Sequence, residues 1–246
     1  MKLFCTTVTG ADENTDINEM IRLAKEYRSL EFGILISESR AGSPRYPSKE
    51  WVIEAGSEFA ARFLQPRFAY HICGSISRDF VAGILDFNKW DKFMPPLQFI
   101  RRMQINVNIG RTEWHPKETA GLIQTMRRMY DDLDEIQVIV QYNHSNYLMW
   151  YDLFKFGIAP HILYDASGGR GKEAKKLDGP IAGFMTGYSG GLGPDNIKEA
   201  LKQIDQVVGN GVTWVDSETK LRTDDNMDLD KVSLFADACA PYHVWR

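Results

Sequence analysis

The sequence predicts a (β/α)8 barrel, and three observations carry that prediction. Short apolar runs rich in β-branched residues alternate with amphipathic helical stretches along the whole chain. Eight such runs recur at intervals of roughly 30 residues, a pattern typical of parallel strands joined by helices. The length of 246 residues fits the roughly 250 residues that one such barrel uses. We therefore expect a single barrel domain over residues 1–246, with a doubly wound open sheet as the alternative.

The first half of the chain supplies four of the expected strands and their helices. The strands are Leu3–Val8, Phe32–Ile36, Phe68–Cys73 and Met103–Ile109, and the helices that follow them are Ile17–Tyr27, Ser48–Phe63, Arg78–Leu85 and Pro116–Tyr130. Ser48 is a suitable N-cap, because its hydroxyl can accept from a free N–H of the first turn. The aromatic and proline-rich stretch Phe87–Leu97 is expected to be an irregular insertion.

The second half supplies the other four strands. They are Ile136–Gln141, His161–Tyr164, Ile181–Thr186 and Val212–Val215, with helices at His144–Phe156, Asp195–Val208 and Leu229–Cys239. Between the sixth and seventh strands lies a glycine-rich loop over 168–179, where any helix is expected to be short or displaced.

Composition excludes several classes of function. The net charge of −4 comes without a basic block, so the chain lacks the clustered Lys/Arg face of a nucleic-acid-binding protein. No apolar run approaches the roughly 18–20 residues of a membrane span, and the start of the chain has no signal-peptide pattern. Three widely spaced cysteines do not predict a disulfide framework. We expect a cytoplasmic monomer or homodimer whose partner is a small molecule, with neither nucleic acid nor membrane involved.

Candidate site residues should follow the strands, because barrels carry their active sites on those loops. Asp165 ends the sixth strand, and Gly168, Gly169 and Gly171 follow it. Glycines let backbone N–H groups converge on an anion. The alternative interpretation of this loop is a flexible surface turn without a ligand. After the seventh strand, Gly190-Gly191 leads into a helix, which is a typical anion site; the alternative is a structural turn.

Other candidates lie at further strand ends. Cys5 on the first strand is either a buried apolar side chain or a general base with a lowered pKa. Arg45 follows the second strand and could bind a carboxylate or stay solvated. Asn106 and Asn108 make the barrel mouth rich in amides, which suits a sugar-like ligand. His71 and Cys73 share a face of the third strand, and a lumen histidine is favoured there over a metal ligand.

Together these segments resemble phosphoribosylanthranilate isomerase, the barrel enzyme of tryptophan biosynthesis. The matching segments are Cys5, Ser43-Pro44-Arg45-Tyr46, Asp165 with its glycine-rich loop, and Gly190-Gly191-Leu192-Gly193-Pro194-Asp195-Asn196-Ile197. The resemblance implies an Amadori rearrangement of an aminoaldose phosphate to an aminoketose phosphate, without cofactor or metal.

The resemblance also implies residue roles. Asp165 would protonate the furanose ring oxygen, and Cys5 would remove the C2 proton. Arg45 would hold the anthranilate carboxylate, and the backbone of Gly190 and Gly191 would bind the phosphate. The loop with Gly169 would contribute to substrate binding.

Two strand ends depart from the family pattern. The fourth strand has no histidine in Gln104-Ile105-Asn106-Val107-Asn108, and the eighth ends in Asp216-Ser217-Glu218 instead of a serine and glycine segment. Ser217 is still expected to complete the phosphate site, but two carboxylates stand beside it and would repel a dianion. Two alternatives follow: a barrel that binds a sugar phosphate without catalysis, or an isomerase or lyase of another substrate with Asp216 or Glu218 as an added acid or base.

Overall fold

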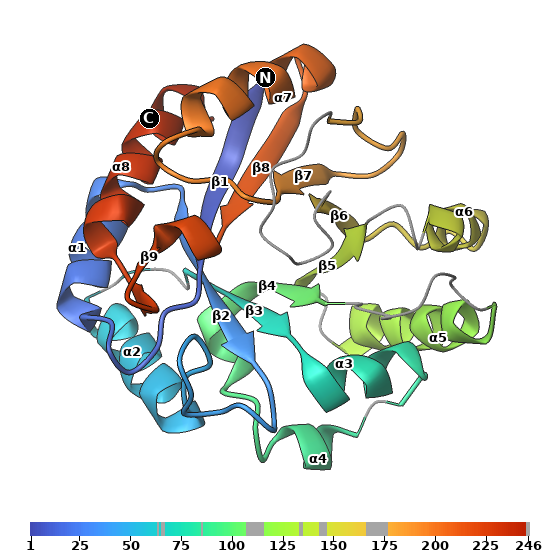
Figure 1. Ribbon diagram of the computed structural model, residues 1–246. Coiled ribbons are helices and arrows are strands. Elements are labelled where there is room, and N and C mark those ends of the chain that lie inside the picture. The colour runs from blue at the N-terminus through green and yellow to red at the C-terminus, as the bar shows by residue number, and fades with distance from the viewer. Residues whose placement is uncertain are drawn as a thin grey trace.

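Eight parallel strands close into a barrel with helices around it (Figure 1). The computed structural model describes residues 1–62, 64, 67–84, 86–106, 116–132, 135–142, 147–165 and 177–244. The strands are β1 Lys2–Thr9, β2 Leu30–Ile36, β3 Phe68–Ile72, β4 Ile100–Ile105, β5 Gln137–Tyr142, β6 His161–Asp165, β7 Thr186–Ser189 and β8 Val212–Ser217. Each strand pairs with the next and β8 pairs with β1. The expected (β/α)8 barrel is confirmed, and the open sheet is excluded.

Helices follow most of the strands on the outside of the barrel. They are α1 Ile17–Glu26, α2 Lys49–Ala61, α3 Gly74–Val81, α4 Phe87–Trp90, α5 Pro116–Asp132, α6 Tyr147–Lys155, α7 Ile197–Val208 and α8 Leu229–Cys239. Short 3-10 turns occur at η1 Leu97–Phe99, η3 Thr219–Leu221 and η4 Ala240–Tyr242, and a two-stranded hairpin is formed by β9 Arg222–Thr223 and β10 Asn226–Met227. No helix in the described part of the chain is long and apolar enough to span a membrane.

Capping side chains fix where several helices begin. Ser48 accepts from the N–H of Trp51 at 3.2 Å, which confirms the expected N-cap of α2. Asp16 accepts from Asn18 N at 2.8 Å, and Asp228 accepts from Lys231 N at 3.1 Å. Each bond satisfies an N–H group that has no partner inside its own helix.

The main hydrophobic core lies between the barrel and its helices. On β2, α2 and β3, the rings of Phe32, Phe59 and Phe68 pack edge to face, with centroids 6.0 and 5.1 Å apart. In the stretch that was expected to be an irregular insertion, Trp90 of α4 is buried and stacks on Phe80 of α3. These aromatic contacts anchor the outer helices and leave the inside of the barrel to a different set of side chains.

Three expected elements differ in position from the structure. The seventh strand is Thr186–Ser189 instead of Ile181–Thr186. Gly183 has a φ of 85°, which ends an extended run, and the apolar side chains around it made that run look like a strand. The helix after β3 begins at Gly74, not at Arg78. The fourth strand starts earlier than expected and ends at Ile105; residues 107–109 of the expected strand lie outside the described part of the chain.

The lower interior of the barrel holds a buried charge pair. The Arg102 guanidinium is 4.5 Å from the Trp214 ring and 4.9 Å from the Phe4 ring, and its Nη1 donates to Glu31 at 2.8 Å. Burying one charge alone costs several kcal/mol, so the carboxylate and the two rings compensate the guanidinium. These side chains fill the barrel interior toward the amino ends of the strands and separate that end from the space at the carboxyl ends.

The rim of the barrel is tied together by a second arginine. Arg222 of β9 is buried and donates to the carbonyl oxygen of Gly10 at 2.6 Å and to Asp12 at 3.3 Å. Asp12 also accepts from the backbone N–H of Arg45 at 2.7 Å. The loops after β1, β2 and β8 are therefore joined into one wall on one side of the barrel mouth.

Candidate active site

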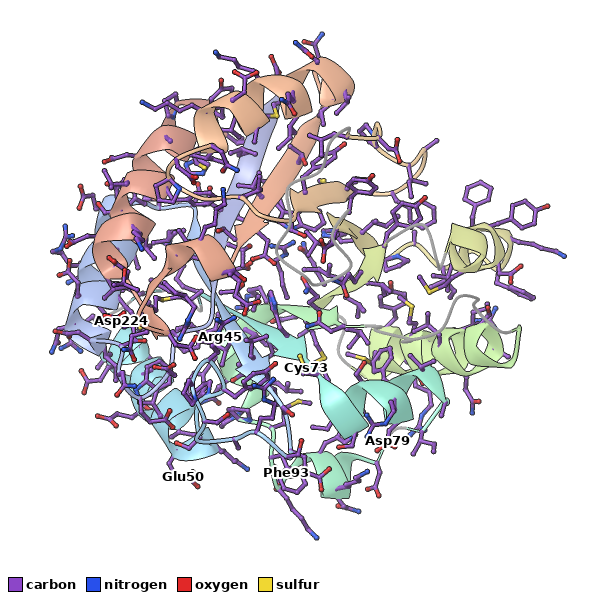
Figure 2. The ribbon with its side chains drawn as sticks, viewed as in Figure 1. Arg45, Glu50, Cys73, Asp79, Phe93 and Asp224 are labelled. Carbon is purple, nitrogen blue, oxygen red and sulfur yellow. The ribbon has the colours of Figure 1, made fainter. Side chains whose placement is uncertain are left out.

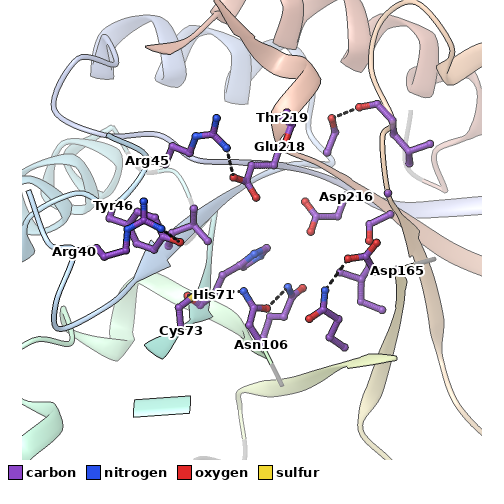
Figure 3. Close-up of a pocket in the computed structure, with 18 of the residues that line it drawn as sticks. Arg40, Arg45, Tyr46, His71, Cys73, Asn106, Asp165, Asp216, Glu218 and Thr219 are labelled. Carbon is purple, nitrogen blue, oxygen red and sulfur yellow. Dashed lines mark hydrogen bonds and ion pairs between the residues drawn. The ribbon is translucent and has the colours of Figure 1, made fainter. Parts of the chain in front are cut away.

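A cavity of about 660 Å³ opens at the carboxyl ends of the strands. Side chains of most of the strands and of the loops after them line it, and they divide by chemistry into two sets (Figure 3). The ionisable set is Arg40, Arg45, Asp165, Asp216, Glu218 and Asp225, and the neutral polar set includes His71, Cys73, Gln104, Asn106, Gln141 and Ser189. Figure 2 places Arg45 and Cys73 toward the middle of the molecule and Glu50 and Phe93 at its edge.

Two buried carboxyl groups reach the cavity from the ends of β6 and β8, the strands on either side of β7. Asp165 ends β6 and is 4% exposed, and Asp216 on β8 is 8% exposed. Asp165 accepts a hydrogen bond from the Gln141 amide at 2.8 Å. Figure 3 shows both carboxyl groups directed toward the same space. The expected position of Asp165 at the end of the sixth strand is confirmed.

The pKa of Asp216 is shifted toward neutrality by its surroundings in the cavity. Burial raises the pKa of Asp216 from 3.8 to about 7; the hydrogen bond from Thr9 acts in the opposite direction, and the Glu218 charge adds to the rise. The Thr9 hydroxyl donates to Oδ1 at 2.8 Å. A carboxyl with a pKa near neutrality populates both protonation states at pH 7, which is the condition for general acid–base work.

The opposite wall carries neutral hydrogen-bonding groups. On β4 and the residue after it, Gln104 donates to the Asn106 side-chain oxygen at 2.7 Å, and Asn106 donates to Cys73 Sγ at 3.1 Å. Burial raises the pKa of Cys73 to about 11 despite that bond, so the thiol stays protonated at neutral pH. Asn106 lines the cavity, within a wall of neutral groups that can hydrogen-bond hydroxyl groups.

The turn after β7 borders the cavity with two consecutive glycines. Gly190 has a φ of 103° and Gly191 a φ of 64°, both in the region that favours glycine. Asn196, the N-cap of α7, fixes the turn by accepting from Gly193 N at 2.8 Å and donating to Gly191 O at 2.9 Å. Ser217 lines the cavity, but its hydroxyl donates to Leu192 O at 2.6 Å. Ser217 thus braces this turn from β8.

Cys5 lies below this cavity and does not line it. It pairs with Trp214 in the β1–β8 register, whereas Thr7 pairs with Asp216. Because Asp216 lines the cavity, its level is reached at Thr7, two residues after Cys5 on β1. The thiol accepts from Arg102 Nη1 at 2.9 Å, and burial raises its pKa well above the ordinary range. The structure therefore separates Cys5 from Asp165, with which it was expected to act.

Arg45 lies at the cavity with its guanidinium paired to two carboxylates of this chain. Nη1 is 3.1 Å from Glu218, and Nη2 is 2.7 Å from Asp225. Its backbone has a φ of 74°, a conformation that is uncommon for a residue with a side chain. Arg45 lines the cavity, and the carboxylates that it pairs with come from the β8 end and the hairpin after it. Arg40 also lines the cavity and stacks 4.3 Å from the Tyr46 ring centroid.

Some expected site residues fall elsewhere, and others were missed. Asn108 and Gly169 lie outside the described residues. In the described part of the chain, no group of three or more His, Cys, Asp or Glu side chains is arranged to hold a metal ion. Gln104 and Arg40 were not expected at the site. Gln104 on β4 lies two positions before Asn106, so the two-residue period of a strand could have identified it.

Comparisons with known proteins show which fold the chain shares with solved structures, but they assign it to no family. No protein-family model matches the chain, and no curated protein matches it. Among solved structures, N-(5'-phosphoribosyl)anthranilate isomerase from Pyrococcus furiosus superposes with a TM-score of 0.52 at 12% identity, over 96% of this chain and 98% of that one. KGPDC from Streptococcus mutans, solved in complex with a sugar phosphate, gives 0.50 at 12% identity, over 100% and 99%. The chain shares the barrel fold of these enzymes.

Proposed function

We propose that this barrel is an acid–base isomerase that converts an aldose phosphate carrying an amino substituent at C1 into the corresponding ketose phosphate. One observation carries the proposal: Asp165 and Asp216 share one cavity, and the pKa of Asp216 is about 7. An Amadori rearrangement needs one proton donor and one proton acceptor at neighbouring atoms, and two carboxyl groups in different environments meet that need. The resemblance to phosphoribosylanthranilate isomerase and the shared fold support this reaction class.

The proposed chemistry has two steps that involve the aspartates, followed by a tautomerisation. In the first, the bond between C1 and the ring oxygen breaks while the nitrogen lone pair forms a C=N bond, and Asp165 acts as the general acid that gives a proton to the oxygen. In the second, the Asp216 carboxylate removes the proton from C2. The electron pair of that C–H bond forms a C1=C2 double bond, and the C=N pair returns to nitrogen. The resulting enaminol becomes the ketone by moving the hydroxyl proton to C1.

Asp216 takes the role of base that the resemblance gave to Cys5. The thiol does not line the cavity, and its raised pKa leaves almost no thiolate at pH 7. Asp216 lines the cavity and is partly ionised at that pH. A thiol two residues below the cavity layer cannot reach a substrate carbon, whereas the carboxyl can.

The glycine turn is the proposed phosphate site. Gly190 and Gly191 line the cavity, and their backbone conformation is held by Asn196 and Ser217. Backbone N–H groups at the start of a helix favour an anion. One structural neighbour was solved with a sugar phosphate bound. This supports the proposal that the cavity binds the same class of ligand. The Glu218 and Asp225 carboxylates already hold Arg45, so the proposal requires no carboxylate on the amino substituent.

Turnover by variants tests the proposal. Wild type, Asp216→Asn, Asp165→Asn and Cys5→Ala would be assayed with N-phosphoribosyl amines, including phosphoribosylanthranilate. Removing a general acid or base lowers kcat by about 10²–10⁴-fold, so both aspartate variants should show that loss, and Cys5→Ala should stay within about threefold of wild type. Loss of activity in Cys5→Ala with activity retained in Asp216→Asn would overturn the assignment, and so would the absence of turnover by wild type.

A second candidate function is sugar-phosphate binding without catalysis. The ion pairs of Arg45 with Glu218 and Asp225 favour it, because they leave that guanidinium engaged within the chain. A bound ligand at 100 times its Kd would raise the free energy of unfolding by about 2.7 kcal/mol. Thermal stabilisation by sugar phosphates without turnover of any of them would select this function.

A further inference from the structure

His71 is a buried imidazole that faces the proposed site. It lies on β3, is 2% exposed and lines the cavity. Figure 3 shows its ring pointing from the strand toward the space shared with Asp216. Within the described residues, its carbonyl oxygen accepts from Cys73 Sγ, and neither ring nitrogen has a hydrogen-bond partner. Because the side chain lines the cavity, a ligand bound there can supply the hydrogen-bond partner that the ring lacks within the described residues.

Gly33 of β2 keeps the space beside this ring open. A Cβ on Gly33 would lie 3.0 Å from His71 Nε2 and 2.1 Å from Thr9 Oγ1. Thr9 is the residue that holds Asp216 at 2.8 Å. The absence of a side chain on Gly33 therefore makes room for the imidazole and for the hydroxyl that orients the Asp216 carboxyl, because both lie against the position of that Cβ.

The imidazole is neutral in this setting. Burial lowers the pKa of His71 to about 3, and the nearby Arg102 charge adds to the effect. A neutral imidazole offers one N–H donor and one acceptor nitrogen. It can bind a hydroxyl group without adding charge, and it is a poor partner for a phosphate dianion, which the glycine turn after β7 would hold.

We propose that His71 binds the C2 hydroxyl of the substrate, beside the carbon whose proton Asp216 removes. The inference rests on the proposed function for the identity of the substrate. His71 and Asp216 then act on the same carbon from β3 and β8. The hydrogen bond holds the hydroxyl that becomes the ketone oxygen and directs the C2 proton toward the carboxylate.

Binding of two probes tests this role without turnover. Ribose 5-phosphate and 2-deoxyribose 5-phosphate differ at C2 only in the hydroxyl. A hydrogen bond between neutral groups is worth between about twofold and tenfold in affinity, so wild type should prefer ribose 5-phosphate by such a factor in calorimetric titrations. His71→Leu should bind both probes equally, and His71→Gln should recover part of the preference.

The control is a histidine outside the cavity. His243 hydrogen-bonds Thr6 at 2.9 Å and does not line the cavity, so His243→Leu should keep the wild-type preference. A preference retained in His71→Leu, or no preference in wild type, would overturn the role of His71 while leaving the proposed function standing. If wild type binds neither probe, the proposed ligand class fails and this inference fails with it.

Discussion

Replacing Asp216 by asparagine should stabilise the protein at neutral and alkaline pH. The folded protein holds the proton of Asp216 up to a pKa of about 7, whereas the ordinary value is 3.8. Between those pH values the folded state binds more protons than the unfolded state, so the free energy of unfolding falls as pH rises. The difference corresponds to at most about 4 kcal/mol above pH 7. Asparagine carries no charge and removes this penalty.

Urea unfolding of wild type and Asp216→Asn from pH 4 to pH 8 would measure this difference in the free energy of unfolding. The two proteins should be similar near pH 4, and the variant should be more stable by up to about 4 kcal/mol at pH 8. Asp225→Asn is the matched control. The hydrogen bond and charge of Arg45 lower the pKa of Asp225, so that variant should lose stability above pH 4. A difference between wild type and Asp216→Asn that does not change with pH would refute the reasoning.

Three further substitutions have defined outcomes. Thr9→Val removes the hydrogen bond that opposes the rise in the pKa of Asp216, so the half-maximal pH of kcat/KM should move upward; Thr9→Ser should restore it, and an unmoved profile would count against the contact. Arg222→Met leaves the buried Asp12 carboxylate without its guanidinium and should lower the free energy of unfolding by about 3–5 kcal/mol; a change below about 1 kcal/mol in denaturant unfolding would contradict that pairing. Gly187→Ala places a Cβ 2.1 Å from Trp214, and calorimetry should show a loss of about 1–3 kcal/mol, whereas an unchanged Tm would mean that the ring can move aside.

The barrel could be predicted from the sequence because the alternation of strand and helix patterns is a local property. The last helix, Leu229–Cys239, was predicted with its bounds, and Ser48 as an N-cap was correct. The seventh strand was misplaced because Ile181–Thr186 is apolar, while the true strand contains Gly187. That glycine is needed where the Trp214 ring approaches, and such an approach is invisible in a local pattern.

The site was predictable only in part, for a similar reason. The positions of Asp165, Asn106, Gly190 and Gly191 follow from where strands end. The separation of Cys5 from the cavity follows from the length of β1 and from its register with β8, which local sequence does not fix. Arg45 meets Asp225 across 180 positions of sequence, through the hairpin β9–β10. The partners of the Arg45 guanidinium therefore depend on how distant loops fold together.

Deuterium exchange at C2 tests the central claim most directly. Wild type, Asp216→Asn and Cys5→Ala would be incubated with an N-phosphoribosyl amine in D2O, and the C2 proton would be followed by NMR. Because the proposed base removes that proton during each turnover, wild type and Cys5→Ala should exchange it, and Asp216→Asn should be slower by about 10²-fold or more. Exchange that persists in Asp216→Asn and disappears in Cys5→Ala would contradict the account.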